Sequence, residues 1–476
     1  MTDYILKLTK TEKYAFRNLY HPKKAFLKLD IRNKINTFDR ITISQQIKFS
    51  MNKIFSILLL FITLSAFSQT SKPKFEGQAT TSTEKVDTRN HAIIPQWRGQ
   101  QTLGNITFDN DFDGARLNGI TQNNDTLYTA IIAAENYPIN PSPWYAFKVS
   151  SKAPKTIWVH LTYLNAKHRY FPKISRDGKT WQVVDSTDCK LVKGPEAKNQ
   201  SFQENALSES AYVRINVDTK TTWIAAQELM TSPIVKEWTK DILKNKFVSS
   251  SIIGKSPQNR PFECLRIGED KSDSKIMLVI GRLHPPEVTG QFALQAFVEA
   301  LCTDSETAKK FRKEYTVYVV PMINPDGVDN GHWRHNTGGI DLNRDWADFN
   351  QPETQIVRDF LRKKLDGTQR KLYFGIDFHS TWDDIFYTNI TEKPSNMDGL
   401  IKRWFDSLEQ AIPTYKVNAR ASKPASAAIS KAFFNKDFNA EALVYEVGDN
   451  TSRDFTKLKS KTAAENLMRL SLDYLK

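Results

Sequence analysis

Residues 232–476 alternate short apolar runs with longer amphipathic segments, and this alternation constrains the fold more than any other feature. The runs favour strands and the segments favour helices. Alternation of the two predicts a mixed, mostly parallel sheet with helices on both faces. The expected strands are 263–267, 275–281, 315–321, 371–377 and 442–447. The expected helices are one that starts at Ser232-Pro233, followed by 288–303, 352–365, 397–411, 424–434 and 461–475.

The expected strand 275–281 leads into a histidine and a carboxylate. Its apolar core, Ile276 to Ile280, is typical of a strand buried on both faces. His284 and Glu287 follow three residues apart. An imidazole nitrogen and a carboxylate oxygen are two of the three protein ligands that a catalytic zinc ion uses. The pair by itself is a weak signal, because short motifs recur by chance.

Three further strand ends carry polar residues of the same kind. The strand 315–321 leads into the segment INPDGVDNGHWRHNTGGIDLNRDW, 371–377 into His379, and 442–447 contains Glu446. In open α/β sheets, sites form beyond the carboxyl ends of the strands. The sequence therefore predicts that these groups meet at one edge of the sheet.

Residues 89–231 have a different texture. The runs 126–134, 144–151, 156–164, 180–184 and 211–217 are rich in β-branched and aromatic residues and are separated by turn residues. This spacing predicts an all-β sandwich in front of the α/β domain. The hairpin SRDGKTW (175–181) resembles one found in discoidin-like carbohydrate-binding sandwiches, so glycan binding by this domain is an open alternative to a plain structural turn.

The N-terminal 88 residues predict export. From Met51, a basic residue, an apolar run (54–64) and small residues at Ala66 and Ser68 form a secretory signal peptide pattern. We expect a signal peptide at 51–68, a flexible lead-in at 69–88 and a periplasmic or extracellular protein without a stable membrane anchor after cleavage. A signal peptide acts at the terminus, so we interpret residues 1–50 as a spurious upstream extension.

The net charge of +14 does not indicate nucleic-acid binding. Residues 1–50 alone hold eleven basic against four acidic side chains, which accounts for half of it. The remainder is an ordinary basic surface for a soluble protein.

Taken together, the motifs of 233–476 resemble the zinc carboxypeptidase family of the carboxypeptidase A/B type. His-x-x-Glu, Asn-Pro-Asp-Gly, an Arg before Asp-Leu-Asn-Arg-Asp-Trp, a strand-end His and a strand-borne Glu occur in the family's order. The variant Arg-x-His-Pro-x-Glu, with a β domain in front, is similar to the cytosolic-carboxypeptidase branch and its bacterial relatives.

The resemblance implies a role for each matched residue. His284, Glu287 and His379 would bind one zinc ion per chain and leave a position open for water. Glu446 would be the general base, and Arg334 would stabilise the oxyanion.

The substrate implied is a peptide with a free C-terminal carboxylate. Asn343 and Arg344 would clamp that carboxylate. Lys431, on the segment before the catalytic Glu, would face the departing side chain and favour an acidic one; its alternative is an exposed helix lysine.

The chain also departs from the family. Pro286 stands where digestive members carry an Arg, and the region 421–434 lacks the family's Tyr. Tyr415 or Tyr387 are candidates to replace that phenol. The leading hypothesis is an exported zinc carboxypeptidase. The alternatives are a zinc amidase or carboxypeptidase that trims cell-wall peptides, and a non-catalytic glycan- or protein-binding protein that uses the β domain.

Overall fold

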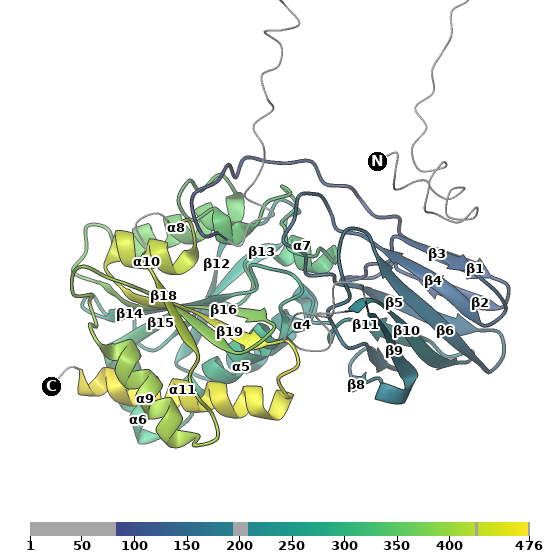
Figure 1. The fold of residues 1–476 in the computed structure, drawn as a ribbon. Coiled ribbons are helices and arrows are strands. Elements are labelled where there is room, and N and C mark those ends of the chain that lie inside the picture. The colour runs from purple at the N-terminus through teal and green to yellow at the C-terminus, as the bar shows by residue number, and fades with distance from the viewer. Residues whose placement is uncertain (1–81, 194–207, 424–426, 475–476) are drawn as a thin grey trace, which may run out of the picture. The chain divides into compact units, whose positions relative to one another are not determined.

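The computed structural model describes residues 82–193, 208–423 and 427–474 (Figure 1). The predicted extension 1–50, the predicted signal peptide 51–68 and most of the predicted lead-in 69–88 lie outside these residues. Among the described residues, no helix is both long and apolar enough to cross a membrane.

The first part of the described chain, which we call the β domain, contains two sheets. One has the strand order β1-β2-β5-β11-β7-β8 and the other β3-β4-β6-β10-β9, and all pairs except β4 with β6 are antiparallel. The strands are β1 (Gln100–Leu103), β2 (Ile106–Asp109), β3 (Gly119–Gln122), β4 (Leu127–Ile132), β5 (Ala146–Ser151), β6 (Lys155–Tyr163), β7 (Lys173–Ser175), β8 (Gln182–Val183), β9 (Cys189–Lys193), β10 (Ser208–Val217) and β11 (Thr222–Ala225).

Alternation along the strands builds the core of this domain. In β4, Tyr128, Ala130 and Ile132 are buried while the residues between them are partly exposed. The same period of two recurs in β6, where Ile157 and Val159 are buried. Side chains at every second position share one face of a strand, so the two inner faces pack into a common apolar cluster.

The second part, which we call the α/β domain, is built on an eight-stranded sheet of order β12-β13-β15-β14-β16-β19-β17-β18. The central strands β15, β14, β16 and β19 are mutually parallel, as the sequence predicts. The strands are β12 (Val248–Lys255), β13 (Pro261–Ile267), β14 (Lys275–Gly281), β15 (Tyr315–Val320), β16 (Leu372–Thr381), β17 (Ile385–Asn389), β18 (Ala419–Ser422) and β19 (Glu441–Gly448).

Helices cover both faces of this sheet (Figure 1). Met277 and Val279 of β14 pack with α5, α6, α9 and α11 on one face, whereas Ile276, Leu278 and Ile280 pack with α8 and α10 on the other. Burial on both faces explains why β14 is continuously apolar. The helices are α4 (Ser232–Ile242), α5 (Val288–Leu301), α6 (Glu306–Glu314), α7 (Pro325–Asp329), α8 (Pro352–Leu365), α9 (Leu400–Ala411), α10 (Ser430–Phe438) and α11 (Arg453–Asp473).

The two domains share apolar packing. Val288, Met322, Val328 and Trp333 belong to the α/β domain by sequence, yet they pack in the same buried cluster as the β-domain strands. Trp333 is fully buried, and its indole Nε1 donates to the carbonyl oxygen of Trp144 at 3.0 Å. The loop that carries Trp333 is therefore enclosed by residues of both domains.

Candidate active site

The loop after β14 carries His284 and Glu287, and it is tied to the neighbouring chain. Arg282 has φ 58°, so the backbone turns sharply as the strand ends. The side-chain Nδ2 of Asn324 donates to Leu283 O at 3.1 Å, and its backbone N–H donates to Arg282 O. Glu287 directly precedes α5, where the positive end of the helix dipole favours a carboxylate.

Sheet register places His379 beside Glu446. His379 lies near the end of β16 and is the direct partner of Glu446 on the parallel strand β19. Helix α5 approaches β16 closely at Gly290, where a Cβ atom would lie 2.5 Å from the carbonyl oxygen of His379. This contact brings Glu287, at the start of α5, next to His379.

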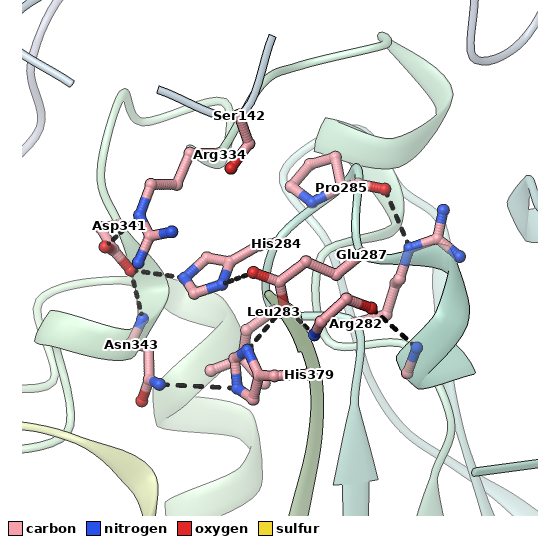
Figure 2. A network of polar contacts seen from close by, with 12 residues as sticks. Ser142, Arg282, Leu283, His284, Pro285, Glu287, Arg334, Asp341, Asn343 and His379 are labelled. Atoms are coloured by element: carbon pink, nitrogen blue, oxygen red, sulfur yellow. Dashed lines mark hydrogen bonds and ion pairs between the residues drawn. The ribbon is translucent and has the colours of Figure 1, made fainter. Parts of the chain in front are cut away.

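Three donor groups converge on one point (Figure 2). His284 Nδ1 lies 2.7 Å from Glu287 Oε1, and His379 Nδ1 lies 2.7 Å from Glu287 Oε2. One ligand atom from each of the three residues lies within 4.8 Å of the others, and all three side chains are buried. Two imidazoles and a carboxylate at this spacing fit a zinc ion with an open coordination position.

Two outer carboxylates orient the imidazoles. Asp341 Oδ1 lies 2.8 Å from His284 Nε2, and Asp377 Oδ2 lies 2.9 Å from His379 Nε2. Such contacts leave each Nδ1 free to face a metal and increase the basicity of the ligand. Neither Asp341 nor Asp377 is among the predicted site residues, although Asp341 lies in the segment after the expected strand 315–321 and Asp377 is the last residue of the expected strand 371–377.

The pKa values show how strongly these charges depend on one another. Burial raises the pKa of Glu287, but the adjacent His284 and His379 outweigh it and hold that pKa well below its usual range. Burial lowers the pKa of His379, yet Asp377 and Glu287 raise it well above the ordinary value. The lowered pKa keeps Glu287 ionised, and an ionised carboxylate between two imidazoles favours a cation at this centre.

Glu446 lies at the edge of this centre with one oxygen available. It is partly buried, and within the described chain its Oε2 has no hydrogen-bond partner. Removal from water and the neighbouring Glu287 raise the pKa of Glu446 to about 8, against the opposing effect of His379 and Arg334. A carboxyl group with a raised pKa is suited to accept and return a proton near neutral pH. We call His284, Glu287, His379 and Glu446 the metal half of the site.

Arg334, Asn343 and Arg344 form a second group, which we call the loop half. Arg334 Nε donates to Asp341 Oδ2 at 2.6 Å, so Asp341 links this arginine to the candidate ligand His284. Asn343 Nδ2 lies 3.5 Å from His379 Nε2. The two halves therefore meet through Asp341 and Asn343.

Arg344 is buried with part of its guanidinium unsatisfied. Its Nη1 donates to Asn343 O at 2.8 Å, and within the described residues its Nε has no partner. Burial lowers the pKa of Arg344, and the Asp341 carboxylate, 3.9 Å away, opposes that shift. A buried arginine with a spare N–H is suited to bind an incoming carboxylate.

Lys431 lies at the start of α10 and is buried, not exposed. Its Nζ donates to Thr388 O, Asn389 Oδ1 and Ser422 Oγ at 2.8, 2.9 and 3.0 Å. Burial lowers its pKa to about 8. Among the described residues, no carboxylate forms an ion pair with it.

The two tyrosines considered as replacements for the family's phenol lie in different environments. Tyr415 is buried in the core of the α/β domain, with the Lys459 ammonium 5.2 Å from its ring centre. Tyr387 is partly buried on β17, next to Arg420 of β18 in register. The negative charge of Glu446 contributes, after burial, to raising the pKa of Tyr387. Of the two tyrosines, Tyr387 is therefore the one close enough to Glu446 to feel its charge.

Several other polar side chains hydrogen-bond within the framework of the two domains. His332 Nδ1 contacts the carbonyl oxygen of His335, and His335 Nδ1 contacts Asn136 Oδ1 at 2.6 Å. Asp326 binds Ser256 and Arg260. In the hairpin 175–181, Asp177 accepts the backbone N–H groups of Lys179 and Thr180, so that carboxylate is used within its own turn.

Known proteins resemble this chain in sequence and in fold. A family model described as zinc carboxypeptidase matches residues 235–474, just over half of the chain. Cytosolic carboxypeptidase 6 of Mus musculus is 24% identical over an alignment of 329 residues, which covers 63% of this chain and 59% of the mouse protein. The alignment thus spans less than two thirds of that relative.

Solved structures show the same fold. A metallo-carboxypeptidase from Burkholderia cenocepacia is similar with a TM-score of 0.62 at 15% identity, covering 78% of this chain and 99% of that one. A metallo-carboxypeptidase from Pseudomonas aeruginosa, solved with (2-guanidinoethylmercapto)succinic acid, has a TM-score of 0.60 at 19% identity, covering 78% and 100%. The aligned 78% of this chain is more than the α/β domain contains, so the structural similarity extends into the β domain.

Proposed function

The chain belongs to the zinc carboxypeptidase family, a family of metallohydrolases, and on this premise we propose that it removes single residues from the C-termini of peptides. The observation that carries the proposal is the convergence of two imidazole Nδ1 atoms on Glu287, with Glu446 beside His379 in the sheet register. Zinc binding by His284, Glu287 and His379, one ion per chain, is part of the proposal.

A bound zinc ion supplies an acidified water molecule and a polarised carbonyl. Glu446 is the group of this chain that accepts the proton of the attacking water and returns it to the departing amine. Its free Oε2 and its raised pKa support this role. Arg334 is held by Asp341 beside the metal half, where its positive charge stabilises the developing oxyanion.

The loop half makes the enzyme specific for chain ends. Arg344 has a spare guanidinium N–H, and Asn343 lies beside it. We infer that these two residues bind the terminal carboxylate of the substrate. An internal peptide bond presents no such anion, so binding energy is available only to a substrate with a free C-terminus.

We further infer a preference for an acidic C-terminal residue. Lys431 is a buried amine that contacts only neutral acceptors in the described part of the chain. A substrate carboxylate would supply the missing counter-charge, which is favourable in a site removed from water. A neutral side chain would leave this ammonium without a charged partner.

The experiment uses the full chain and the Glu446→Gln variant. Metal content is measured first, and a library of peptides with mixed C-terminal residues is then incubated and analysed by mass spectrometry. We expect about one zinc per chain in both proteins, and loss of single C-terminal residues, mainly Asp and Glu, only with the unaltered protein. A zinc-loaded protein that cleaves no peptide would contradict the proposed activity.

We also propose that the protein is exported. The pattern of residues 51–68 supports this, because it combines a basic start, an apolar run and small residues before Gln69. Sequencing the N-terminus of the protein made by its own host tests the idea. A mature chain that starts near Gln69 is expected, and a chain that retains Met51 would contradict export by cleavage.

A further inference from the structure

Three consecutive backbone N–H groups, those of residues 333–335 in the loop that carries Arg334, donate to one carboxylate of the β domain. Glu135 Oε2 accepts from Trp333 N at 2.7 Å, and Oε1 accepts from Arg334 N and His335 N at 3.0 and 2.7 Å. Glu135 is fully buried and belongs to the segment after β4. The middle N–H is that of Arg334, the residue placed at the oxyanion.

The charge around Glu135 is balanced to keep it ionised. Burial raises its pKa, but His332, His335, Arg116 and the N–H of Trp333 together lower it to about 2. The guanidinium of Arg116 lies 3.9 Å from Glu135 Oε2. An ionised carboxylate that accepts several backbone N–H bonds is a strong anchor in a buried site.

Other contacts hold the same loop from the same side. Arg116 Nε donates to Gly331 O at 2.7 Å, and Asn136 Nδ2 donates to Gly339 O at 3.0 Å. The β-domain backbone comes so close at Gly331, which has φ 66°, that a Cβ there would lie 2.3 Å from Ala115 O. The α/β domain supplies Asp341 for the side chain of Arg334, but the backbone of Arg334 is fixed from the β domain.

We propose that Glu135 is a positioning residue for Arg334, so that the β domain completes the loop half of the site. The proposal rests on the proposed function, in which Arg334 stabilises the oxyanion. A carboxylate that clamps three successive N–H groups fixes the backbone from which the guanidinium reaches toward Asp341. A shift of that backbone would weaken the hydrogen bonds that matter in the transition state more than those to the substrate in its ground state.

The test compares Glu135→Gln with a matched variant, Glu228→Gln, in the full zinc-loaded chain. Glutamine keeps the size of Glu135 but places an NH₂ donor against backbone donors. Glu228 also joins the two domains, through Arg453, and among the described residues its ion pairs are to Arg453 and Lys173, not to the loop 331–336. We expect Glu135→Gln to lower kcat about 10–100-fold with KM changed less than about threefold, and Glu228→Gln to leave both near the unaltered values.

A double-mutant cycle with Arg334→Gln separates positioning from a general structural role. If Glu135 acts through Arg334, Glu135→Gln has little further effect on kcat once Arg334→Gln is present. An equal fall in kcat in both backgrounds, or an unchanged kcat in Glu135→Gln, would overturn the proposal.

Amide hydrogen exchange of the peptide spanning 331–336 gives a readout that does not depend on activity. Glu135→Gln should speed exchange there, whereas Glu228→Gln should not. Unchanged exchange in Glu135→Gln would count against the anchor. If the unaltered protein cleaves no peptide, the proposed activity fails, but the exchange comparison still decides whether Glu135 holds the loop.

Discussion

The metal half and the loop half of the site meet through Asp341 and Asn343, but different parts of the chain hold them in place. Parallel strands and the start of α5 set the metal half, and its register is visible in the pairing of His379 with Glu446. The residues of the loop half lie in a segment that, in the described structure, belongs to no strand. The backbone N–H of Arg334 in this segment donates to Glu135 of the β domain. The comparison suggests that the sheet fixes the candidate metal ligands and Glu446, whereas the domain contact fixes the backbone of Arg334.

Glu446→Gln tests the metal half with the largest expected effect. Glutamine keeps the shape of the side chain but cannot accept a proton from water, so kcat should fall about 10³-fold. Zinc content should be unchanged, since Glu446 is not among the three converging ligands. Steady-state kinetics and metal analysis of the same preparation check this. A loss of zinc in this variant would move Glu446 into the ligand set.

Glu135→Gln tests the loop half through the pH dependence of the free energy of unfolding. The pKa of Glu135 is about 2 in the folded chain against an ordinary 4.5, so its ionised form stabilises the fold above about pH 4.5. That stabilisation is lost as the pH falls toward 2.

Urea unfolding from pH 7 down to the acid limit of the fold should therefore show a stability gap between the unaltered protein and Glu135→Gln that is full at neutral pH. The gap should narrow steadily below about pH 4.5. A gap that stays constant with pH would show that the variant fails through packing instead of through the lost charge.

Asp341→Asn tests the link between the two halves. Asp341 contacts both His284 and Arg334, so the variant should weaken zinc binding about 10–100-fold and also lower kcat at saturating zinc. Asp377→Asn is the matched control, because Asp377 contacts the ligand His379 and the hydroxyl of Ser430 but not Arg334. Zinc titration and kinetics at saturating zinc should separate the two variants. Identical behaviour would mean that Asp341 serves the metal half alone.

Two of the strands that position the metal half were predictable because most of each is an apolar run, whereas β16 extends four residues beyond the expected 371–377 and contains His379. The expected strands 275–281 and 442–447 correspond to β14 and β19 within one residue. Burial on both faces of a central strand leaves few alternatives to such a run. The expected helix 352–365 matches α8, which begins with Pro in its first turn.

The edge strands gave no comparable signal. β12 contains Ser249, Ser250 and Ser251, and most of β18 is exposed. A strand that buries little has no hydrophobic pattern to read. The helix expected at 424–434 begins later, at Ser430, because the backbone of the preceding Ile429 is extended, with φ −113° and ψ 161°.

The supports of the loop half were not predictable for a different reason. Glu135 lies 198 residues before its partner Trp333, in a segment with no motif of its own. Only the packing of one domain on the other brings them together. Asp341 stood in a recognised motif, but its double contact with His284 and Arg334 depends on the loop's conformation.

Lys431→Met tests whether the buried ammonium of Lys431 determines the preference for an acidic C-terminal residue. Methionine is close in length to lysine but carries no charge, so it removes the ammonium while largely filling the same space. We expect kcat/KM for peptides ending in Asp or Glu to fall about tenfold, as for the loss of a hydrogen bond between charged groups. Peptides ending in Leu should be cleaved as well as before or better, because the variant has no buried ammonium that lacks a counter-charge.

Competition between two peptides that differ only in the last residue measures the ratio of their kcat/KM values directly. An equal fall for both peptides would place Lys431 in the support of β17 and β18, through Thr388 and Ser422, instead of in substrate recognition.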